Sequence, residues 1–592
     1  MTIKNLLIAA GIMAGVCTAA QAASTDTIPA FPGAEGHARY AVTAGKGTSV
    51  EIRHVTTLKD ASNTSTKGTL RWAVNGKTNK IVVFDVGGTI ELTKELIIGA
   101  NTYIAGQTAP SPGITLRYYT VRPNGDNIAM RFIRIRRGNE VDVNDGADAI
   151  WSRQKTAQIL DHCSFSWSID EIASFYDINN YTMQWCTLSE ALANAGHDKG
   201  AHSYGGIWGG KLASFHHCMI AHTQNRTPRF NGARYMWSGY TSNKLYSQYN
   251  WENYVQAENV DFRNCLIYNV GTGGCYGGPG GGYINMVNNY YKAGPATKNK
   301  TRVTQVTVGA AGNSTTGDLI GMTSRYYIKG NYMASVDQED YDWNGVIFDS
   351  GTYLIDGYRC SVDPKNFYGD TVPHYTNSEG TSCVRIKLES PAPAGDVTTH
   401  TAKEAYNKIL LYCGASLYRD AEDTRYMQEA ESGTATYTGS ETGQPGIIDK
   451  VSDVGGYTAL ESTARPADWD TDQDGMPDDW ETANGLDPND ASDAKAYTLD
   501  SRKWYTNVEV YINSLVRDIV DGGNADAETG IDEYWPECNA SKIEAVSDAA
   551  AKITSTTYYN TAGMQVSEDY KGIVIRKDML SNGKHIQRKI MQ

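Results

Sequence analysis

The sequence predicts an all-β protein whose central part is a parallel β-helix, followed by a partly helical tail and a small C-terminal β segment. Three observations lead to this fold class: a strand-like segment that recurs along the chain, many turn-forming glycines, and apolar residues at helical spacing only after the last recurrence. The 592 residues include 59 Gly and 38 Tyr against 10 Phe. This composition is typical of an extracytoplasmic β-rich protein with several domains, not of a compact α/β enzyme.

The recurring segment carries a small residue at a fixed position. The copies align on Cys163, Cys186, Cys218, Cys265, Asn289 and Asn331, with Phe132 in the same slot upstream. They recur at intervals of about 23 to 47 residues, as expected for a coil whose strands stack while its loops vary in length. Small side chains at one position predict an interior ladder of compact thiols and stacked amides. Chance recurrence of the cysteines is the alternative, and the apolar positions that recur beside them disfavour it.

Residues 1–22 have the features of a secretion signal. Lys4 precedes an apolar run over residues 6–20, and Ala20-Gln21-Ala22 is a small-x-small cleavage site. We therefore expect a secreted, periplasmic or cell-surface protein. No later stretch approaches about 18 uninterrupted apolar residues, so no transmembrane segment is expected.

The net charge limits the kinds of ligand that the protein can bind, and the cysteine content bears on disulfide formation. The formal charge of −14 argues against nucleic acid and other polyanions bound by bulk attraction, so an acidic ligand would need cations at the site itself, from Lys, Arg or metal. Ten cysteines in an exported chain would ordinarily indicate disulfides. Four of them belong to the ladder, on rungs about 4.8 Å apart, so their pairing stays open. We expect a monomer.

An acidic loop lies after the coil, at residues 470–481. Its oxygen donors occupy loop positions one, three, five, seven, nine and twelve: Asp470, Asp472, Asp474, the carbonyl of Met476, Asp478 and Glu481. Gly475 stands at position six, and the whole pattern matches a calcium loop. Because so many neighbouring carboxylates would repel one another without a cation, a merely solvated acidic loop is the weaker interpretation. The position after the coil predicts a structural calcium.

The sequence therefore divides into five parts. These are a signal peptide (1–22), a β-helix domain (23–335), loops and a helical tail packed on the coil (336–465), a calcium-loop region (466–540) and a small β segment (545–592). The helical part, residues 401–428, has apolar residues at helical spacing. The last segment alternates as short strands and resembles the C-terminal sorting domains of secreted Bacteroidota proteins. A small accessory β domain without a sorting role is the alternative.

Polar motifs within the coil resemble those of the pectate lyases of polysaccharide lyase family 1. The matching pieces follow in family order within residues 31–333: 68–71, 81–90, 104–107, 148–150, 161–164, 215–217 and 226–229. The resemblance implies a right-handed parallel β-helix that cleaves polygalacturonate, or pectin, by β-elimination, with calcium bound between the enzyme and the substrate uronates.

The resemblance also implies roles for particular residues. The catalytic base falls on Arg226 of Arg226-Thr227-Pro228-Arg229, and the substrate-binding lysine on Lys199. The catalytic calcium ligands fall on Asp148 and Asp170.

Two positions depart from the family pattern. Asn231 stands where a second arginine is expected, which leaves Arg229 or Arg234 to supply that substrate contact. Ser174 stands in place of a calcium carboxylate, and Glu171 is the candidate substitute.

The chemistry of these residues agrees with elimination. Removing the C5 proton of a galacturonate requires the neighbouring carboxylate to be neutralised, which calcium and Lys199 can do. Free arginine has a pKa far above neutral, so an arginine base predicts an alkaline optimum. The pair Asp161 and His162 also matches the family, but its place on an inward strand favours a structural hydrogen bond over acid/base work.

Two other functions compete with this one. A polygalacturonase-type hydrolase on the same scaffold needs a cluster of aspartates, which Asp145, Asp148, Asp161 and Asp170 could supply. A non-catalytic pectin-binding or adhesion protein is the other, supported only by the departures at Asn231 and Ser174. Ultraviolet absorbance of an unsaturated product separates elimination from hydrolysis, and a binding protein would retain polygalacturonate without shortening it.

Overall fold

The computed structural model describes residues 27–143, 147–232, 258–279, 282–308, 323–348, 354–355, 358–360, 374–376, 382–538, 553–560, 565–567, 570–571, 573–580 and 585–591. The signal segment 1–22, Asp145 and Arg234 lie outside these residues. Within them, no helix has both the length and the hydropathy needed to cross a membrane.

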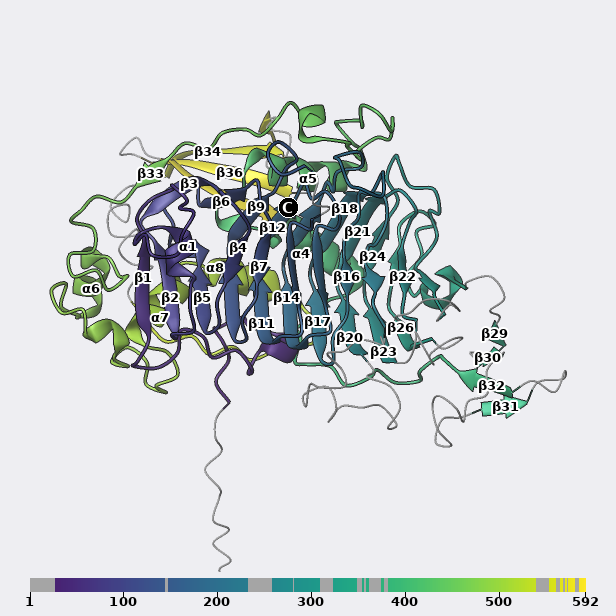
Figure 1. Ribbon diagram of the computed structural model, residues 1–592, viewed down its shortest axis with the longest axis horizontal. Coiled ribbons are helices and arrows are strands. Elements are labelled where there is room, and N and C mark those ends of the chain that lie inside the picture. The colour runs from purple at the N-terminus through teal and green to yellow at the C-terminus, as the bar shows by residue number, and fades with distance from the viewer. Residues whose placement is uncertain are drawn as a thin grey trace, which may run out of the picture.

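Three long sheets, whose coil strands pair in parallel, form the body of the molecule (Figure 1). The first sheet runs β1 (Glu51–Val55), β2 (Lys80–Phe84), β5 (Thr102–Ala105), β8 (Ile128–Arg131), β11 (Thr156–Asp161), β14 (Asn179–Gln184), β17 (Ala213–His216), β20 (Glu258–Arg263), β23 (Gly282–Val287) and β26 (Arg325–Lys329). The second runs β3 (Val86–Glu91), β6 (Ile114–Arg117), β9 (Ile133–Arg136), β12 (Ser164–Ser166), β15 (Thr187–Ser189), β18 (Met219–Thr223), β21 (Leu266–Val270), β24 (Tyr290–Lys292) and β27 (Tyr332–Met333). The third runs β4 (Leu96–Ile98), β7 (Val121–Pro123), β10 (Ile150–Arg153), β13 (Ala173–Tyr176), β16 (Ile207–Trp208), β19 (Arg229–Phe230), β22 (Cys275–Gly277), β25 (Thr304–Val306) and β28 (Val346–Phe348).

Within the coil, each turn of the chain contributes one strand to each sheet. Neighbours in a sheet are therefore every third strand, as in β5, β8 and β11. The strands follow one another along the long axis in Figure 1, from purple to teal. This is the parallel β-helix that the sequence predicts.

The predicted interior ladder is confirmed by the pairing of the first sheet. Asp161 pairs with Gln184, Gln184 with His216 and His216 with Arg263, which brings the cysteine two residues after each of them into one column. The four cysteines are buried, unpaired thiols. Further along, the Asn289 amide donates to the side-chain oxygen of Asn331 (3.0 Å), so the asparagines continue the column as an amide stack.

The placement of Phe132 in this column is wrong by one residue. Arg131 pairs with Asp161, so Phe132 lies beside His162 and not beside Cys163. Phe132 and His162 both have left-handed backbone (φ 54° and 49°), and their rings stack with centroids 4.9 Å apart. The stack continues from His162 through Trp185 to His217 (5.8 and 4.2 Å). Phe132 therefore packs in the turn between two strands, one position before the interior column of cysteines.

Two helices cover the second sheet, as expected for the tail. They are α4 (Ala402–Tyr412), capped by Thr401, and α5 (Ala421–Ser432), capped by Asp420. Ile409 and Met427 pack against the buried Leu266 of the sheet. The start of α5 is anchored by the buried Arg136, which ion-pairs with Asp420 and with Asp423 (2.8 Å each).

The remaining elements are shorter. Further helices are α1 (Leu70–Ala73), α6 (Asp478–Asn484), α7 (Asn507–Ser514) and α8 (Arg517–Asn524), and β33 (Thr463–Ala464) pairs antiparallel with β3. A four-stranded sheet contains β29 (Leu354–Ile355), β30 (Tyr358–Cys360), β31 (His374–Thr376) and β32 (Ser382–Arg385). The C-terminal strands are β34 (Ile553–Asn560), β35 (Gln565–Val566), β36 (Ile573–Leu580) and β37 (His585–Met591), which form an antiparallel sheet, so the expected short strands are present there.

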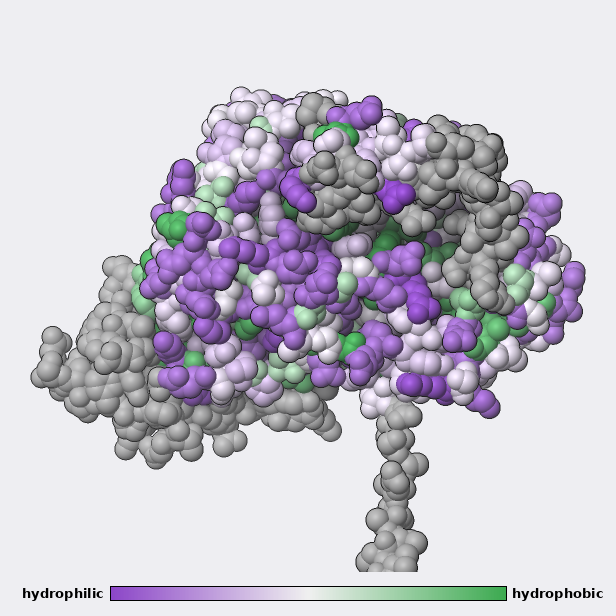
Figure 2. Space-filling view, turned by 180° about the vertical axis from the view of Figure 1, so that it is seen from behind, coloured by the Kyte–Doolittle hydropathy of each residue, from purple (hydrophilic) through white to green (hydrophobic). Residues whose placement is uncertain are grey.

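Apolar side chains gather inside the coil and not on its surface. Leu160, Met183 and Phe215 are fully buried in one cluster that extends from Val55 to Ile386. On the face opposite to that of Figure 1, hydrophilic side chains cover most of the surface and hydrophobic ones are scattered (Figure 2). The outward positions of the sheets are therefore the place to look for polar chemistry.

Candidate functional site

The candidate site lies at the turn that precedes the third sheet. Glu171 pairs with Tyr204 and Tyr204 with Asn225 as isolated parallel bridges, just before β13, β16 and β19. One rung earlier, the Ala149 N–H donates to the Glu171 carbonyl (3.2 Å). Stacking of successive turns thus brings Asp148, Glu171 and Asn225 into one column, with Arg226 directly after it, although they lie far apart in the sequence.

Three carboxylates converge in this column. Oxygens of Asp148, Asp170 and Glu171 lie within 4.8 Å of one another, and Asp148 and Glu171 are buried. Burial and, to a smaller extent, the neighbouring Asp170 carboxylate raise the pKa of Asp148 to about 8. A buried Asp170 oxygen has no hydrogen-bond partner. A dense group of carboxylates with an unsatisfied oxygen fits a hard divalent cation such as calcium.

Ser174, the first departure from the family pattern, supports this group. Its side chain hydrogen-bonds the Asp148 carboxylate and accepts the Ile207 N–H (3.3 Å). Glu171, proposed as its substitute, stands among the converging carboxylates. The serine therefore orients one acid, and Glu171 supplies the third.

Arg226 stands beside the carboxylates. Its guanidinium forms an ion pair with Glu171 and lies 4.1 Å from the centroid of the Tyr204 ring. The residue has left-handed backbone (φ 59°), which is uncommon for a large side chain and is often found at functional sites. Its carbonyl accepts the Gly206 N–H (2.7 Å), so the turn is tied to the preceding rung. The turn thereby aims the guanidinium at the acidic group.

Two histidines surround Asp170. Nε2 of His197 lies 3.4 Å from one Asp170 oxygen, and Nε2 of His202 lies 3.8 Å from the other. Lys199 is exposed in the same loop, and its backbone N–H donates to Nδ1 of His197 (3.0 Å). Sequence reasoning missed His202 and Tyr204, because neither belongs to a motif. An alignment of successive turns of the coil would have placed Tyr204 between Glu171 and Asn225.

Of the two residues considered after Arg226, Arg229 is half-buried and Asn231 lies in the interior. Arg229 begins β19 and is half-buried, between Ile207 and Tyr276 on the adjacent rungs. Asn231 is buried, and its amide donates to the Glu258 carboxylate (3.0 Å). The asparagine therefore serves packing, which leaves Arg229 as the described candidate for the second substrate contact.

Asp161 and His162 form a structural pair, as expected from their inward strand. The Asp161 carboxylate receives hydrogen bonds from Arg131 Nε (2.6 Å) and Gln184 (2.9 Å), and it lies 2.6 Å from His162 Nδ1. Although burial alone would raise the pKa of Asp161, His162 and Arg131 hold it well below its usual range. Because Asp161 is fully buried, it does not meet a substrate.

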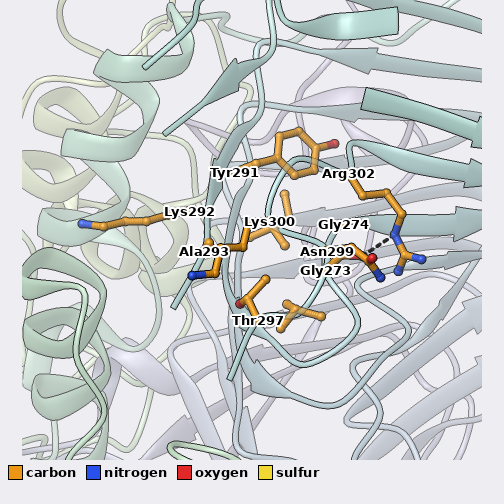
Figure 3. Close-up of a pocket in the computed structure, with 11 residues that line it drawn as sticks. Gly273, Gly274, Tyr291, Lys292, Ala293, Thr297, Asn299, Lys300 and Arg302 are labelled. Carbon is orange, nitrogen blue, oxygen red and sulfur yellow. Dashed lines mark hydrogen bonds between the residues drawn. The ribbon is translucent and has the colours of Figure 1, made fainter. Parts of the chain in front are cut away.

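An open cleft of about 470 Å³ adjoins the carboxylates. It is lined by Glu95, Tyr119, Thr120, Asp142, Ala147, Asp148, Trp151, Arg153, Asp170 and Glu171. A second hollow, between Gly273 and Arg302, measures only about 10 Å³ (Figure 3). That volume is near the minimum for one water. Of these two hollows, only the cleft can admit a polymer.

The acidic loop after the coil forms a separate group. Carboxylates of Asp470, Asp472 and Asp474 lie within 4.8 Å of one another, as do those of Asp474, Glu481 and Asp493. Both oxygens of Asp472 and of Glu481 are without hydrogen-bond partners. Burial, together with repulsion among the carboxylates, raises the pKa of Asp474 and of Glu481 to about 8. These unsatisfied oxygens fit a calcium ion.

Two details of the loop differ from the sequence pattern. Asp478 accepts hydrogen bonds from the Thr471 N–H and hydroxyl (2.8 and 2.6 Å) and is absent from the carboxylate groups found among the described residues. Asp493, outside the motif, joins them. Met476 is buried, packing with Trp480 against the start of the coil. The loop thus docks α6 and α7 on the first rungs.

Glu481→Gln is expected to lower the melting temperature in calcium by several degrees, because it removes a carboxylate from the loop group. Differential scanning calorimetry with calcium and with chelator measures this. Asp479→Asn is the matched control, since Asp479 is exposed and outside the group. Equal melting temperatures for Glu481→Gln and the parent, in both conditions, would contradict a calcium role for the loop.

The geometry defines a class of protein: a parallel β-helix with a group of three carboxylates that could hold a cation, and an arginine beside them at the turn before the third sheet. No family model matches the sequence. Curated relatives, however, share most of its length. Probable pectate lyase C of Aspergillus terreus is 31% identical over 501 residues, which cover 83% of this chain and 95% of the relative. That of Aspergillus flavus is 32% identical over 500 residues, with the same coverage. The chain therefore belongs to the pectate lyase family and is a polysaccharide lyase.

Solved structures similar to this chain have lower identity. A pectate lyase from Bacillus sp. N165 in complex with trigalacturonate is 13% identical, with a TM-score of 0.35, covering 64% of this chain and 98% of that one. Pectate lyase C from Erwinia chrysanthemi is 11% identical, with a TM-score of 0.32, covering 66% and 98%. The family is established by the similarity in sequence to the Aspergillus proteins and not by these structural superpositions.

Proposed function

We propose that this protein is an exported pectate lyase that cleaves polygalacturonate by calcium-assisted β-elimination, with Arg226 as the base. One observation carries the proposal: Asp148, Asp170 and Glu171 converge within 4.8 Å, and Arg226 pairs with the last of them. The carboxylates line one open cleft, and the candidate proton acceptor pairs with one of them. The names of the Aspergillus relatives support pectate as the substrate.

The calcium-binding residues and the base have separate tasks in this proposal. Asp148, Asp170 and Glu171 would hold calcium, which when bound would neutralise the uronate carboxylate beside the C5 proton. Arg226 then accepts the C5 proton. As the C4–C5 double bond forms, the C4–O bond breaks, and the leaving oxygen takes a proton from water. Lys199 and Arg229 are proposed to bind neighbouring carboxylates.

Arg226 can accept a proton only after losing its own. Because free arginine is charged at neutral pH, we expect the rate to rise toward alkaline pH. The stacked Tyr204 ring and the tied backbone hold the guanidinium in place for this step.

The hydrolase alternative is weakened by the position of its candidate aspartates. Asp161 is buried against Arg131, while Asp148 and Asp170 belong to one group of carboxylates. The three described candidates therefore leave no separate acid and base across a bond. Asp145 lies outside the described residues.

The direct test follows ultraviolet absorbance during incubation with polygalacturonate at alkaline pH, with calcium or with chelator. Absorbance that rises only with calcium supports the proposal. Shortened chains without absorbance would indicate a hydrolase. Retention of polymer without shortening would indicate a binding protein.

The export part of the proposal rests on residues 1–22 and is tested separately. Expression of the full chain in a bacterial host should yield extracytoplasmic protein whose N-terminus begins at Ala23. An intact Met1 on cytoplasmic protein would contradict it.

Asp148→Asn is expected to raise the calcium concentration required for activity, because it removes one of three converging carboxylates. Excess calcium should partly restore the rate, and Asp170→Asn should behave alike. Calcium titration of the initial rate measures this. Asp142→Asn, which changes a cleft acid outside the group, should leave the calcium midpoint unchanged. An unchanged midpoint in Asp148→Asn would place the calcium elsewhere.

A further inference from the structure

A second group of metal-ligating side chains lies beside the three carboxylates. Ligand atoms of Asp170, His197 and His202 lie within 4.8 Å of one another. Asp170 precedes Glu171 in the turn before β13, and the two histidines lie in the loop one rung further along. The proposed function uses Asp170 as a calcium ligand and gives neither histidine a role. The histidine pair is therefore a feature of this turn that calcium does not explain.

The hydrogen bonds of His202 fix its tautomer. Its Nδ1 lies 2.7 Å from the carbonyl oxygen of Gly200, and because a carbonyl only accepts, Nδ1 carries the hydrogen. Nε2 of the neutral ring therefore presents a lone pair, and it lies 3.8 Å from an Asp170 oxygen. Metal-binding histidines are commonly held in this way, with one nitrogen on a backbone carbonyl and the other free for the ion.

The Asp170 oxygen that faces His202 is Oδ1, which is buried and has no hydrogen-bond partner. Two acceptors that face each other repel unless a cation lies between them. A separation of 3.8 Å is too long for a hydrogen bond. Two ligands bound tetrahedrally to one zinc ion, at about 2.0–2.2 Å each, lie about 3.4 Å apart. Nε2 of His197 lies 3.4 Å from the other Asp170 oxygen, so both separations are near those of ligands around one ion.

His197 is held against His202 but in the other tautomer. The two rings stack with centroids 3.6 Å apart. Nδ1 of His197 accepts the Lys199 N–H (3.0 Å), so the hydrogen of the neutral ring is on Nε2. To bind a metal through Nε2, His197 must shift this hydrogen to Nδ1 and give up the bond from Lys199. We therefore expect His197 to be the weaker ligand of the two.

The loop that carries the histidines is tied to its surroundings. The His202 N–H donates to the Ala193 carbonyl (2.8 Å), and the Ala193 N–H donates to the carbonyl of Ile448 in the tail (2.9 Å). The side chains of His197 and His202 are only 7% and 8% exposed, whereas that of Asp170 is 20% exposed. An ion that enters past Asp170 would thus meet imidazoles that are already in position.

The nitrogen ligands select the kind of ion. Calcium prefers sites made of oxygen, whereas two imidazoles and a carboxylate suit Zn²⁺, Co²⁺ or Ni²⁺. The carboxylates of Asp148 and Glu171, which converge on Asp170, favour a cation here, and the exposed Lys199 is the one nearby opposing charge named for this loop. The group is thus distinct in chemistry from the calcium group, although the two share Asp170.

We propose that Asp170, His197 and His202 bind a transition-metal ion of the zinc type. Because Asp170 belongs to both groups and two neighbouring dications repel, zinc should oppose the binding of calcium to Asp148, Asp170 and Glu171. Zinc would then inhibit an elimination that depends on calcium. This consequence, unlike the binding itself, rests on the proposed function.

The direct test titrates the full chain, without a histidine tag, with Zn²⁺ against a chromophoric chelator. Excess calcium is present, since it competes at the groups made of oxygen alone. His202→Gln should weaken zinc binding at least about a hundredfold and His197→Gln about tenfold. Asp198→Asn, which changes an exposed acid of the same loop outside the group, should bind zinc as the parent does.

A second probe needs no variant. Co²⁺ should give the parent a visible absorption band from imidazole ligation, and zinc should remove it. A parent that binds neither Zn²⁺ nor Co²⁺ would overturn the inference, even if His202→Gln did not fold. Folded His202→Gln that binds zinc as tightly as the parent would overturn it as well.

The activity measurement is kept apart from the binding measurement. Zinc should raise the calcium midpoint of elimination severalfold in the parent, and should not do so in His202→Gln when each protein is compared with its own rate without zinc. Zinc that binds without moving the midpoint would overturn the competition for Asp170. A parent without elimination would overturn the proposed function, while the zinc titration would still report on His197 and His202.

Discussion

Arg226→Lys is expected to reduce elimination by several orders of magnitude while polygalacturonate still binds. Lysine keeps the positive charge beside Glu171 but loses the planar guanidinium stacked on Tyr204, so the proton acceptor changes its reach and geometry. The loss should appear in kcat, as for removal of a principal catalytic group. Initial rates from ultraviolet absorbance at alkaline pH, with saturating calcium, measure it.

The comparison variant for this experiment is Arg229→Lys. Arg229 begins the next strand and is proposed to contact substrate, so its replacement should raise KM more than it lowers kcat. Melting temperatures should confirm that both variants fold. Retained elimination in Arg226→Lys, or its restoration by excess calcium, would move the base elsewhere, and Lys199 would be the first residue to test.

Cys218→Asp is expected to destabilise the coil by about 3–5 kcal/mol, the cost of an uncompensated buried charge. Cys218 is fully buried between Cys186 and Cys265 in the interior column, where its thiol contacts the carbonyls of Met183 and His216 (3.5 and 3.3 Å) as well as the two neighbouring thiols. A carboxylate there would meet carbonyl acceptors and only the weak thiol donors of Cys186 and Cys265. Denaturant unfolding, or the loss of soluble protein, measures the effect.

Cys218→Asn separates charge from shape. Asparagine occupies the same column at Asn289 and Asn331, where amides bond from rung to rung. The neutral amide should therefore cost much less than the carboxylate. If Cys218→Asp unfolded no more easily than Cys218→Asn, the column would not be the dry interior that the structure indicates.

Several features of the fold could be predicted from the sequence because they repeat or are contiguous. The recurring small residue predicted the coil and the stacking of the six residues that carry it, since each rung buries the same position. The acidic loop between Asp470 and Glu481 was predicted because calcium ligands on a short loop lie at fixed offsets along the chain. Arg226 could be singled out as the candidate base because the residues of its motif are adjacent in the sequence.

The sequence by itself determined the architecture, the positions of the carboxylates and the arginine, and membership of a lyase family. Only the tertiary structure decided which side chains meet. Loops of variable length separate successive rungs, so Asp148, Glu171, Tyr204 and Arg226 have no fixed spacing, yet stacking at about 4.8 Å brings their turns together. The same stacking places Phe132 beside His162 instead of in the cysteine column. Asp493 joins the acidic loop because the chain folds back after α6, which no spacing along the sequence shows.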